Sequence, residues 1–93
     1  GGGRVYTPET VVRKIERALN RFSENEKDKR VLVRLHPIIA LNIFEKEPNF
    51  LRNVGRVTKL RIALRDDPLL REDEFRILSG PAETDVTLQY ASM

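Results

Sequence analysis

The clearest pattern of apolar positions lies near the N-terminus, where it predicts a helix from Tyr6 to Phe22. The apolar side chains recur every three or four residues, which places them on one face of a helix. Thr7 can accept a backbone N–H as the N-cap, and Pro8 suits the first helical position because its missing N–H needs no partner there. Tyr6 and Val11 have the spacing of a hydrophobic staple. The buried face of this helix is expected to hold Val11, Val12, Ile15, Ala18, Leu19 and Phe22.

Further along the chain, apolar and polar residues alternate, which predicts strands. The strands are expected at 30–35, 57–64, 74–79 and 84–90, and a polar loop is expected at 23–29. Two helices are expected between the first two strands, at 37–45 and 48–54, with Gly55 as the C′ residue of the second. This order predicts an α/β fold: a small mixed sheet of about four strands with two to three helices packed on it.

The core is expected where the first helix meets one face of the sheet, together with the Ile38, Ile39 and Ile43 side of the second helix. In the last strand, Val86, Leu88 and Tyr90 would share one face. The side chains expected to be buried together are Val12, Ile15, Leu19, Phe22, Val31, Val33, Ile39, Leu60, Ile62, Phe75 and Ile77.

Residues with chemical potential are few. The sequence holds no nucleophile–base combination and no metal-ligand spacing. The single histidine, His36, could be a general base or a ligand, but its place before Pro37 favours the N-cap of a helix. Asp66 and Asp67, followed by Pro68, favour a turn over a cation site. We therefore expect no catalytic residue, no metal site and no cofactor in this chain.

Arginine dominates the basic residues. The chain has 12 Arg and 5 Lys against 14 acidic residues, a net charge of +3. Arginine offers a planar fork that suits phosphate and carboxylate, so the composition tilts toward nucleic acid or an ionic interface. Arg13, Arg17 and Arg21 form a ridge on the first helix. This ridge could contact phosphates, or it could be a solvated face partly paired with acidic neighbours.

A second basic set falls on one face of the predicted sheet. A face that mixes arginine with apolar side chains suits RNA or a protein interface better than bulk water, with a solvated face as the other interpretation. No aromatic residue interrupts it, so it is not a base-stacking platform. By the two-residue alternation this face carries Arg30, Arg34, Lys59, Arg61 and Arg76, interrupted by Leu32, Ala63 and Leu78.

Length and composition bound the setting. The 93 residues are enough for one domain, expected at 7–93, with 1–6 as a linker remnant. The chain has no cysteine, so a disulfide framework is excluded within it and a reducing compartment, the cytoplasm, is expected. No apolar run approaches the ~20 residues of a membrane span.

Five segments, taken in order, resemble the C-terminal small domain of the ribonuclease E/G family. They are TPETVVRKIER (7–17), VLVRLHPIIA (31–40), LRNVGRVTKLRIALRDDP (51–68), EDEFRIL (72–78) and TDVTLQY (84–90). Their order and spacing carry the resemblance, which runs from about Val5 to Tyr90. The resemblance implies a thioredoxin-like fold, without redox activity because C-x-x-C is missing. In that family a glycine-rich zinc-link precedes this domain, and Gly1–Gly3 would be its tail.

The resemblance also implies a function. The family's catalytic carboxylates, S1 RNA-binding domain and 5′-monophosphate sensor lie upstream, so no catalytic residue carries over to this chain. The chain would be a non-catalytic module of an endoribonuclease that cuts single-stranded RNA, with magnesium and zinc in the parent. Its partners would be the upstream catalytic domain, RNA through the parent, and further copies in a homo-oligomer, with no membrane. The residues leave open a free-standing α/β interaction or RNA-binding module with no enzymatic parent.

Overall fold

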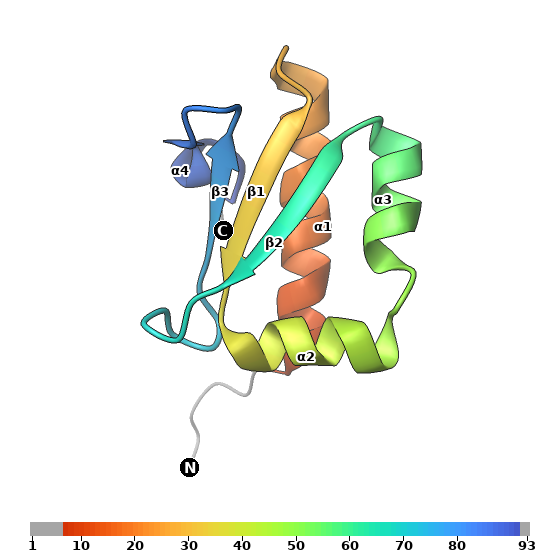
Figure 1. The fold of residues 1–93 in the computed structure, drawn as a ribbon, viewed down its shortest axis with the longest axis vertical. Coiled ribbons are helices and arrows are strands. Elements are labelled where there is room, and N and C mark those ends of the chain that lie inside the picture. Colours follow the sequence, from red (N-terminus) through yellow and green to blue (C-terminus); the bar gives the residue numbers. More distant parts are fainter. Residues whose placement is uncertain (1–6, 92–93) are drawn as a thin grey trace.

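The computed structural model describes residues 7–91, so the expected linker at 1–6 and the Tyr6 half of the staple lie outside the described residues. The predicted α/β class is confirmed, with four helices where two to three were expected (Figure 1). In chain order, the elements are α1 (Pro8–Asn25), β1 (Arg30–Leu35), α2 (Pro37–Lys46), α3 (Phe50–Thr58), β2 (Arg61–Asp66), β3 (Phe75–Ser79), β4 (Thr84–Asp85) and α4 (Thr87–Tyr90).

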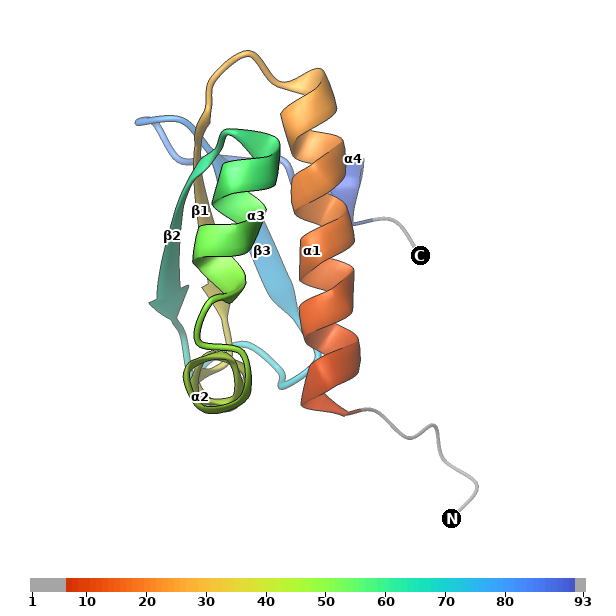
Figure 2. The same cartoon turned by 90° about the vertical axis from the view of Figure 1, so that its right-hand side faces the viewer.

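The four strands form one mixed sheet in the order β2-β1-β3-β4. β1 is parallel to β2 and antiparallel to β3, and β4 is antiparallel to β3. A parallel pair requires a long connection, which α2 and α3 supply. Helices α1, α3 and α4 lie on the same side of the sheet, and α2 crosses the end where β1 and β2 finish (Figures 1 and 2). No described helix covers the other face (Figure 2).

Helix α1 begins as the sequence predicts and ends three residues later. The hydroxyl oxygen of Thr7 accepts a hydrogen bond from the backbone N–H of Thr10 at 3.3 Å. The backbone N–H of Glu26 bonds to the carbonyl of Phe22 at 2.8 Å, which adds a final turn. All six apolar residues predicted for its inner face are buried.

The core lies between α1 and the sheet, as expected. Of the eleven side chains predicted to be buried together, ten are buried, and Ile62 is half-buried on the edge strand β2. Phe22 is fully enclosed and meets the ring of Tyr90 edge-on, with centroids 5.6 Å apart. Ile38 was assigned to the inner side of α2 but is 42% exposed, because α2 crosses the end of the sheet and buries only Ile39 and Ile43.

The passage from α3 to β2 differs from the prediction. Gly55 is not the C′ residue but lies inside α3, and Val57 and Thr58 are helical instead of opening a strand. A Cβ at Gly55 would meet the carbonyl oxygen of Leu60 at 3.2 Å, so the glycine permits close approach of the helix to the start of β2. The helix ends at Lys59, which is in the left-handed conformation with φ of 65°.

The predicted fourth strand at 84–90 is mostly wrong. Only Thr84 and Asp85 pair with β3, and the chain then turns into the short helix α4. Leu88 therefore does not share a face with Val86 and Tyr90, as was expected: it is 89% exposed, whereas those two residues are buried. A turn precedes this strand, where the N–H of Glu83 bonds to the carbonyl of Gly80 at 3.1 Å.

A candidate nucleic-acid or protein interface

The strand register places the predicted basic residues on the uncovered face of the sheet. Arg30 of β1 is opposite Arg61 of β2, and Arg34 of β1 lies between Arg65 of β2 and Arg76 of β3. Between these rows, Leu32 is flanked by Ala63 and Leu78. Because directly opposite residues point to the same side of a sheet, these residues share one surface. We call it the open face: Arg30, Leu32, Arg34, Arg61, Ala63, Arg65, Arg76 and Leu78.

The open face loses one predicted residue and gains another. Lys59 does not belong to the open face, because it ends α3 and precedes β2. Arg65 does belong to it, although the predicted strand stopped at Leu64. Arg65 could have been predicted from the alternation Arg61–Ala63–Arg65, because β2 extends past Leu64 and ends only at Asp66.

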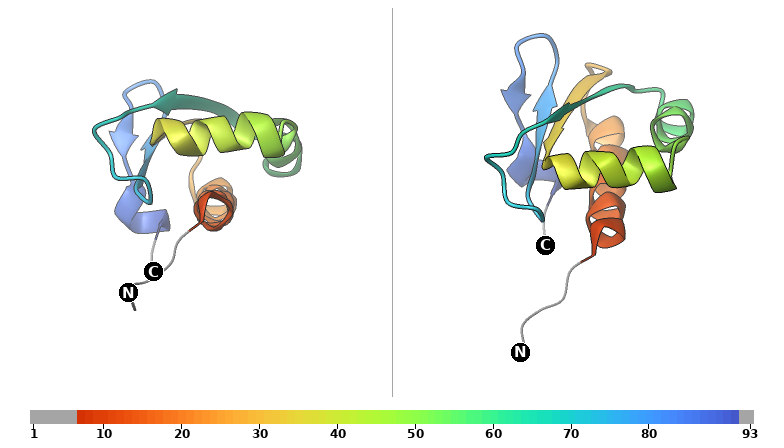
Figure 3. Two further views of the ribbon diagram at one scale, coloured as in Figure 1. Left: turned by 90° about the horizontal axis from the view of Figure 1, so that it is seen from below. Right: turned by 60° about the horizontal axis from the view of Figure 1, so that its bottom comes forward.

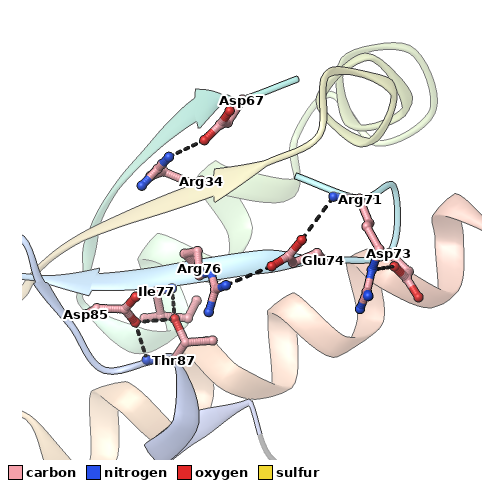
Figure 4. Close-up of polar contacts among 9 residues, drawn as sticks. All are labelled: Arg34, Asp67, Arg71, Asp73, Glu74, Arg76, Ile77, Asp85 and Thr87. Atoms are coloured by element: carbon pink, nitrogen blue, oxygen red, sulfur yellow. Dashed lines mark hydrogen bonds and ion pairs between the residues drawn. The ribbon is translucent and has the colours of Figure 1, made fainter. Parts of the chain in front are cut away.

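Carboxylates accompany most of the open-face arginines (Figure 4). Arg34 forms an ion pair with Asp67, the residue after β2. Arg76 contacts Glu74 at 2.8 Å. The pairs at the rim are longer: Arg30–Asp28 at 3.4 Å and Arg65–Glu83 at 3.7 Å. Sequence reasoning missed these acidic partners. Asp28, Asp67 and Glu83 come from loops whose paths the alternation of the strands does not predict, whereas Glu74 lies two residues before Arg76 and could have been found by that alternation.

Arg61 differs from its neighbours on the open face. Within residues 7–91 no carboxylate lies within ion-pair distance of it, and its side chain is exposed. It also stands directly opposite Arg30 in the parallel pair. Like charges in opposite positions repel, so Arg61 is the open-face cation most available to an anionic partner.

The carboxylates near the open face are held in their charged form. The backbone N–H of Leu69 and the guanidinium of Arg34 bond to Asp67 and lower its pKa. The hydroxyl and backbone N–H of Thr87 lower the pKa of Asp85, with a smaller contribution from the charges of Arg76 and Arg34. At neutral pH these acids therefore stay ionised and offset part of the positive charge.

The ridge predicted on α1 divides between two sides of the molecule. Successive residues at i+4 rotate by about 40° around a helix, so Arg13 and Arg21 diverge by about 80°. Arg13 turns toward the α2–α3 connection, where it pairs with Glu47 and Glu16 and lies 5.8 Å from the centroid of the Phe50 ring. Arg17 and Arg21 line a separate groove, between α1 and the β3 and α4 segments.

That groove, which we call the α1–β3 groove, has a volume of about 500 Å³. Its walls are α1 on one side and β3, α4 and the segment that leads into β3 on the other. Sequence reasoning missed the groove and two of its cations, Lys14 and Arg71, because no local pattern links α1 with residues 71–76. The charged residues that line it are Lys14, Arg17, Arg21, Arg71, Asp73, Glu74 and Arg76.

The structure supports the capping and turn interpretations of His36 and Asp67. The Nδ1 of His36 accepts a hydrogen bond from the N–H of Ile38 at 3.1 Å, as an N-cap does. Oδ1 of Asp67 accepts from the N–H of Leu69 at 3.0 Å, as in an Asx turn. Among residues 7–91, no three His, Asp or Glu side chains gather closely enough to hold a metal ion.

Comparisons with known proteins do not assign the chain to a family. A scan against protein-family models finds no match, and a search of curated proteins finds none. In the part of the chain described here, no helix combines the length and apolarity needed to cross a bilayer.

Proposed function

We propose that this chain is the non-catalytic C-terminal module of a ribonuclease E/G-type endoribonuclease, a cytoplasmic enzyme that cuts single-stranded RNA in RNA processing or decay. The module would have a thioredoxin-like fold. It would hold a place in the assembly through the upstream catalytic domain and through further copies of the enzyme. Magnesium would act in the catalytic domain and zinc in the link before this module, so no described residue here needs to bind either.

The observation that carries the proposal is the open face. A sheet covered by helices on one side only leaves half-buried Leu32 and exposed Ala63 among arginines on the other, with Leu78 in the same row but only 6% exposed. Arginine is favoured at interfaces because its guanidinium is weakly hydrated and its fork binds carboxylate or phosphate in two places. A surface of this kind suits a domain that packs against a partner. The five sequence segments that resemble the family's small domain supply the identity of that partner.

A free-standing α/β interaction or RNA-binding module is the second candidate. The same open face supports it, because an arginine-rich surface needs no enzymatic parent to bind RNA or an acidic protein. The two candidates differ in what the gene encodes before Gly1, and in whether this chain belongs to a larger enzyme.

The test begins with the reading frame. We expect a Cys-Pro-x-Cys link directly before the glycines, and before it an acidic catalytic segment and an S1 domain. The protein encoded by that whole frame should cleave single-stranded RNA with magnesium, whereas residues 1–93 alone should not. A reading frame without the cysteine pair and the catalytic segment would leave the free-standing module as the function.

A further inference from the structure

The α1–β3 groove concentrates positive charge from distant parts of the sequence. Its lining holds five cations against two carboxylates. Both carboxylates are already engaged on the β3 side: Arg71 contacts Asp73 at 3.5 Å, and Arg76 contacts Glu74 at 2.8 Å (Figure 4). The backbone N–H of Arg71 also donates to Glu74 at 3.0 Å. The acidic residues therefore neutralise the β3 wall and leave the α1 wall positive.

On the α1 wall, Lys14 and Arg17 are exposed, and neither has an ion-pair partner within residues 7–91. Arg21 reaches the opposite wall, where its guanidinium donates a hydrogen bond to the carbonyl of Tyr90 at 3.1 Å. These three cations are spaced by three and four residues and so lie on one side of the helix. At 1.5 Å per residue the row is about 10 Å long. A single small anion cannot contact the whole row, whereas an extended polyanion can.

Apart from Thr87, the uncharged residues of the groove are mainly apolar. Phe75, Tyr90 and Ala91 contribute to its lining, and Leu88 stands at the rim with 89% of its surface exposed. A row of cations beside an apolar surface suits a polymer with charged groups along one side and flat apolar groups along the other. Single-stranded nucleic acid has this character, because its phosphates follow the backbone and its unpaired bases are free to make apolar contacts.

An acidic peptide fits the groove less well. A peptide usually gains affinity in such a place by adding a strand to a free sheet edge. The outer edge of β3 is mostly occupied: the carbonyl of Ile77 accepts from the N–H of Val86 at 2.9 Å, and its N–H donates to Thr87. Since strand residues alternate in the direction of their backbone groups, only Phe75 is left to pair with a peptide there.

We propose that the α1–β3 groove binds single-stranded nucleic acid, with Lys14 and Arg17 on its phosphates and Leu88 against a base. The charge and shape of the groove carry this inference. Only the choice of RNA over DNA rests on the proposed function. The groove shares Arg76 with the open face. Helices α1 and α4, which contribute to the groove, lie on the side of the sheet away from the open face (Figure 3, left).

The test uses the whole 93-residue chain and a fluorescent oligouridylate, with binding measured by anisotropy at several salt concentrations. The variant K14Q/R17Q should bind about tenfold more weakly. A plot of the logarithm of the binding constant against the logarithm of the salt concentration has a negative slope. This slope should become less steep by about 0.7 for each lost phosphate contact, about 1.4 in all. The matched control is K27Q/R52Q, which also removes one lysine and one arginine without an ion-pair partner in the described chain. It should bind like the unaltered protein, and equal losses in both variants would overturn the proposal.

A second pair of variants, L88K and L88E, adds a positive or a negative charge at the groove and should change the affinity in opposite directions. Because Leu88 is exposed, neither L88K nor L88E should disturb folding, as circular dichroism would verify. L88K should tighten binding of the oligouridylate and L88E should weaken it. Polyglutamate of equal charge should compete poorly, and competition as strong as that of the RNA would overturn the proposal in favour of an acidic protein. Equal binding of oligodeoxythymidylate would support the groove as a nucleic-acid site. An absence of binding to either strand would refute the groove and leave the test of the proposed function, made on the reading frame, untouched.

Discussion

The backbone N–H of Ile77 donates a hydrogen bond to the hydroxyl oxygen of Thr87 at 2.8 Å, and this bond ends the sheet beside β3. If β4 continued beyond Asp85, as the sequence predicts, it would offer a backbone carbonyl at this place. Instead the side chain of Thr87 supplies the acceptor, and its own hydroxyl donates to Asp85 at 2.6 Å. The chain is thereby free to turn into α4, which forms part of the α1–β3 groove.

This relationship gives the first prediction. Replacing Thr87 with valine keeps the shape of a side chain that is only 7% exposed but removes the acceptor for the N–H of Ile77. An unpaired buried donor costs about 1–3 kcal/mol, and we expect the free energy of unfolding to fall by that amount in urea titrations. T87S retains the hydroxyl and should lose much less. A stable T87V variant beside a destabilised T87S variant would mean that the methyl group, and not the hydrogen bond, carries the stability.

A comparison of α1 and β1 with segment 84–90 shows which parts of the fold could be predicted from the sequence and which could not. The apolar period of α1, its Thr7 cap and the alternation in β1 are local patterns, and each predicted its element and its buried face. The segment 84–90 also alternates, yet it becomes a helix after two strand residues. The segment does alternate, but whether it stays a strand or turns into a helix depends on the Thr87–Ile77 hydrogen bond, which joins residues from two elements. No local pattern contains that contact.

The candidate site was predictable to a similar extent. The open face followed from parity along the strands, apart from Lys59 and Arg65, where the strand boundaries were displaced by two residues or more. The α1–β3 groove was not predictable, because it depends on how α1 lies against residues 71–76. A ridge at i, i+4, i+8 was expected to act as one surface, but the rotation of the helix separates Arg13 from Arg21.

The second prediction concerns the loss of stability at low pH through Asp85. The pKa of Asp85 is lowered in the folded state by its hydrogen bonds from Thr87. Its contribution to stability is therefore complete above the ordinary aspartate pKa of about 4, and it is lost as the pH falls through the lower folded value. An asparagine side chain at this position would accept the same bonds without a charge, so D85N should be less stable than the unaltered protein at neutral pH. The gap should narrow below about pH 4. A gap that is constant with pH in urea titrations would rule out the charge as its source.

The third prediction concerns the phenol of Tyr90, which donates a hydrogen bond to Glu26. Burial, followed by the bond to Glu26 and its charge, raises the pKa of Tyr90 from 10.0 to about 12. In a Y6F background, which removes the chain's other tyrosine, the ultraviolet titration should have its midpoint near that value. The neutral phenol stabilises the fold below the ordinary pKa, and this stability is lost as the pH rises between the two values. E26Q should move the midpoint down. A midpoint at the ordinary value, with circular dichroism still native, would contradict the assignment.

The fourth prediction concerns the core. Phe22 is fully buried and contacts Tyr90, so F22A should lower the free energy of unfolding by about 3–5 kcal/mol. In a domain of this size that loss can unfold the chain at room temperature. Phe44 is the matched control, because it is 67% exposed on α2. F44A should change stability by less than about 0.5 kcal/mol, and similar losses from the two substitutions would mean that α1 is wrongly placed against the sheet.

The last prediction separates stability from binding on the open face. Arg61 faces Arg30 across the parallel pair and has no acidic partner within the described residues, so R61E would replace a repulsive pair with an attractive one. We expect the free energy of unfolding to stay the same or rise by about 0.2–1 kcal/mol.

If the open face serves assembly, light scattering should show a smaller oligomer for R61E with little dependence on salt. If it contacts RNA, the oligouridylate affinity should fall and the salt slope should decrease by about one contact. A folded R61E variant that matches the unaltered protein in mass and in RNA affinity at both low and high salt would leave the open face as solvated surface, and the proposed module would then need another docking surface.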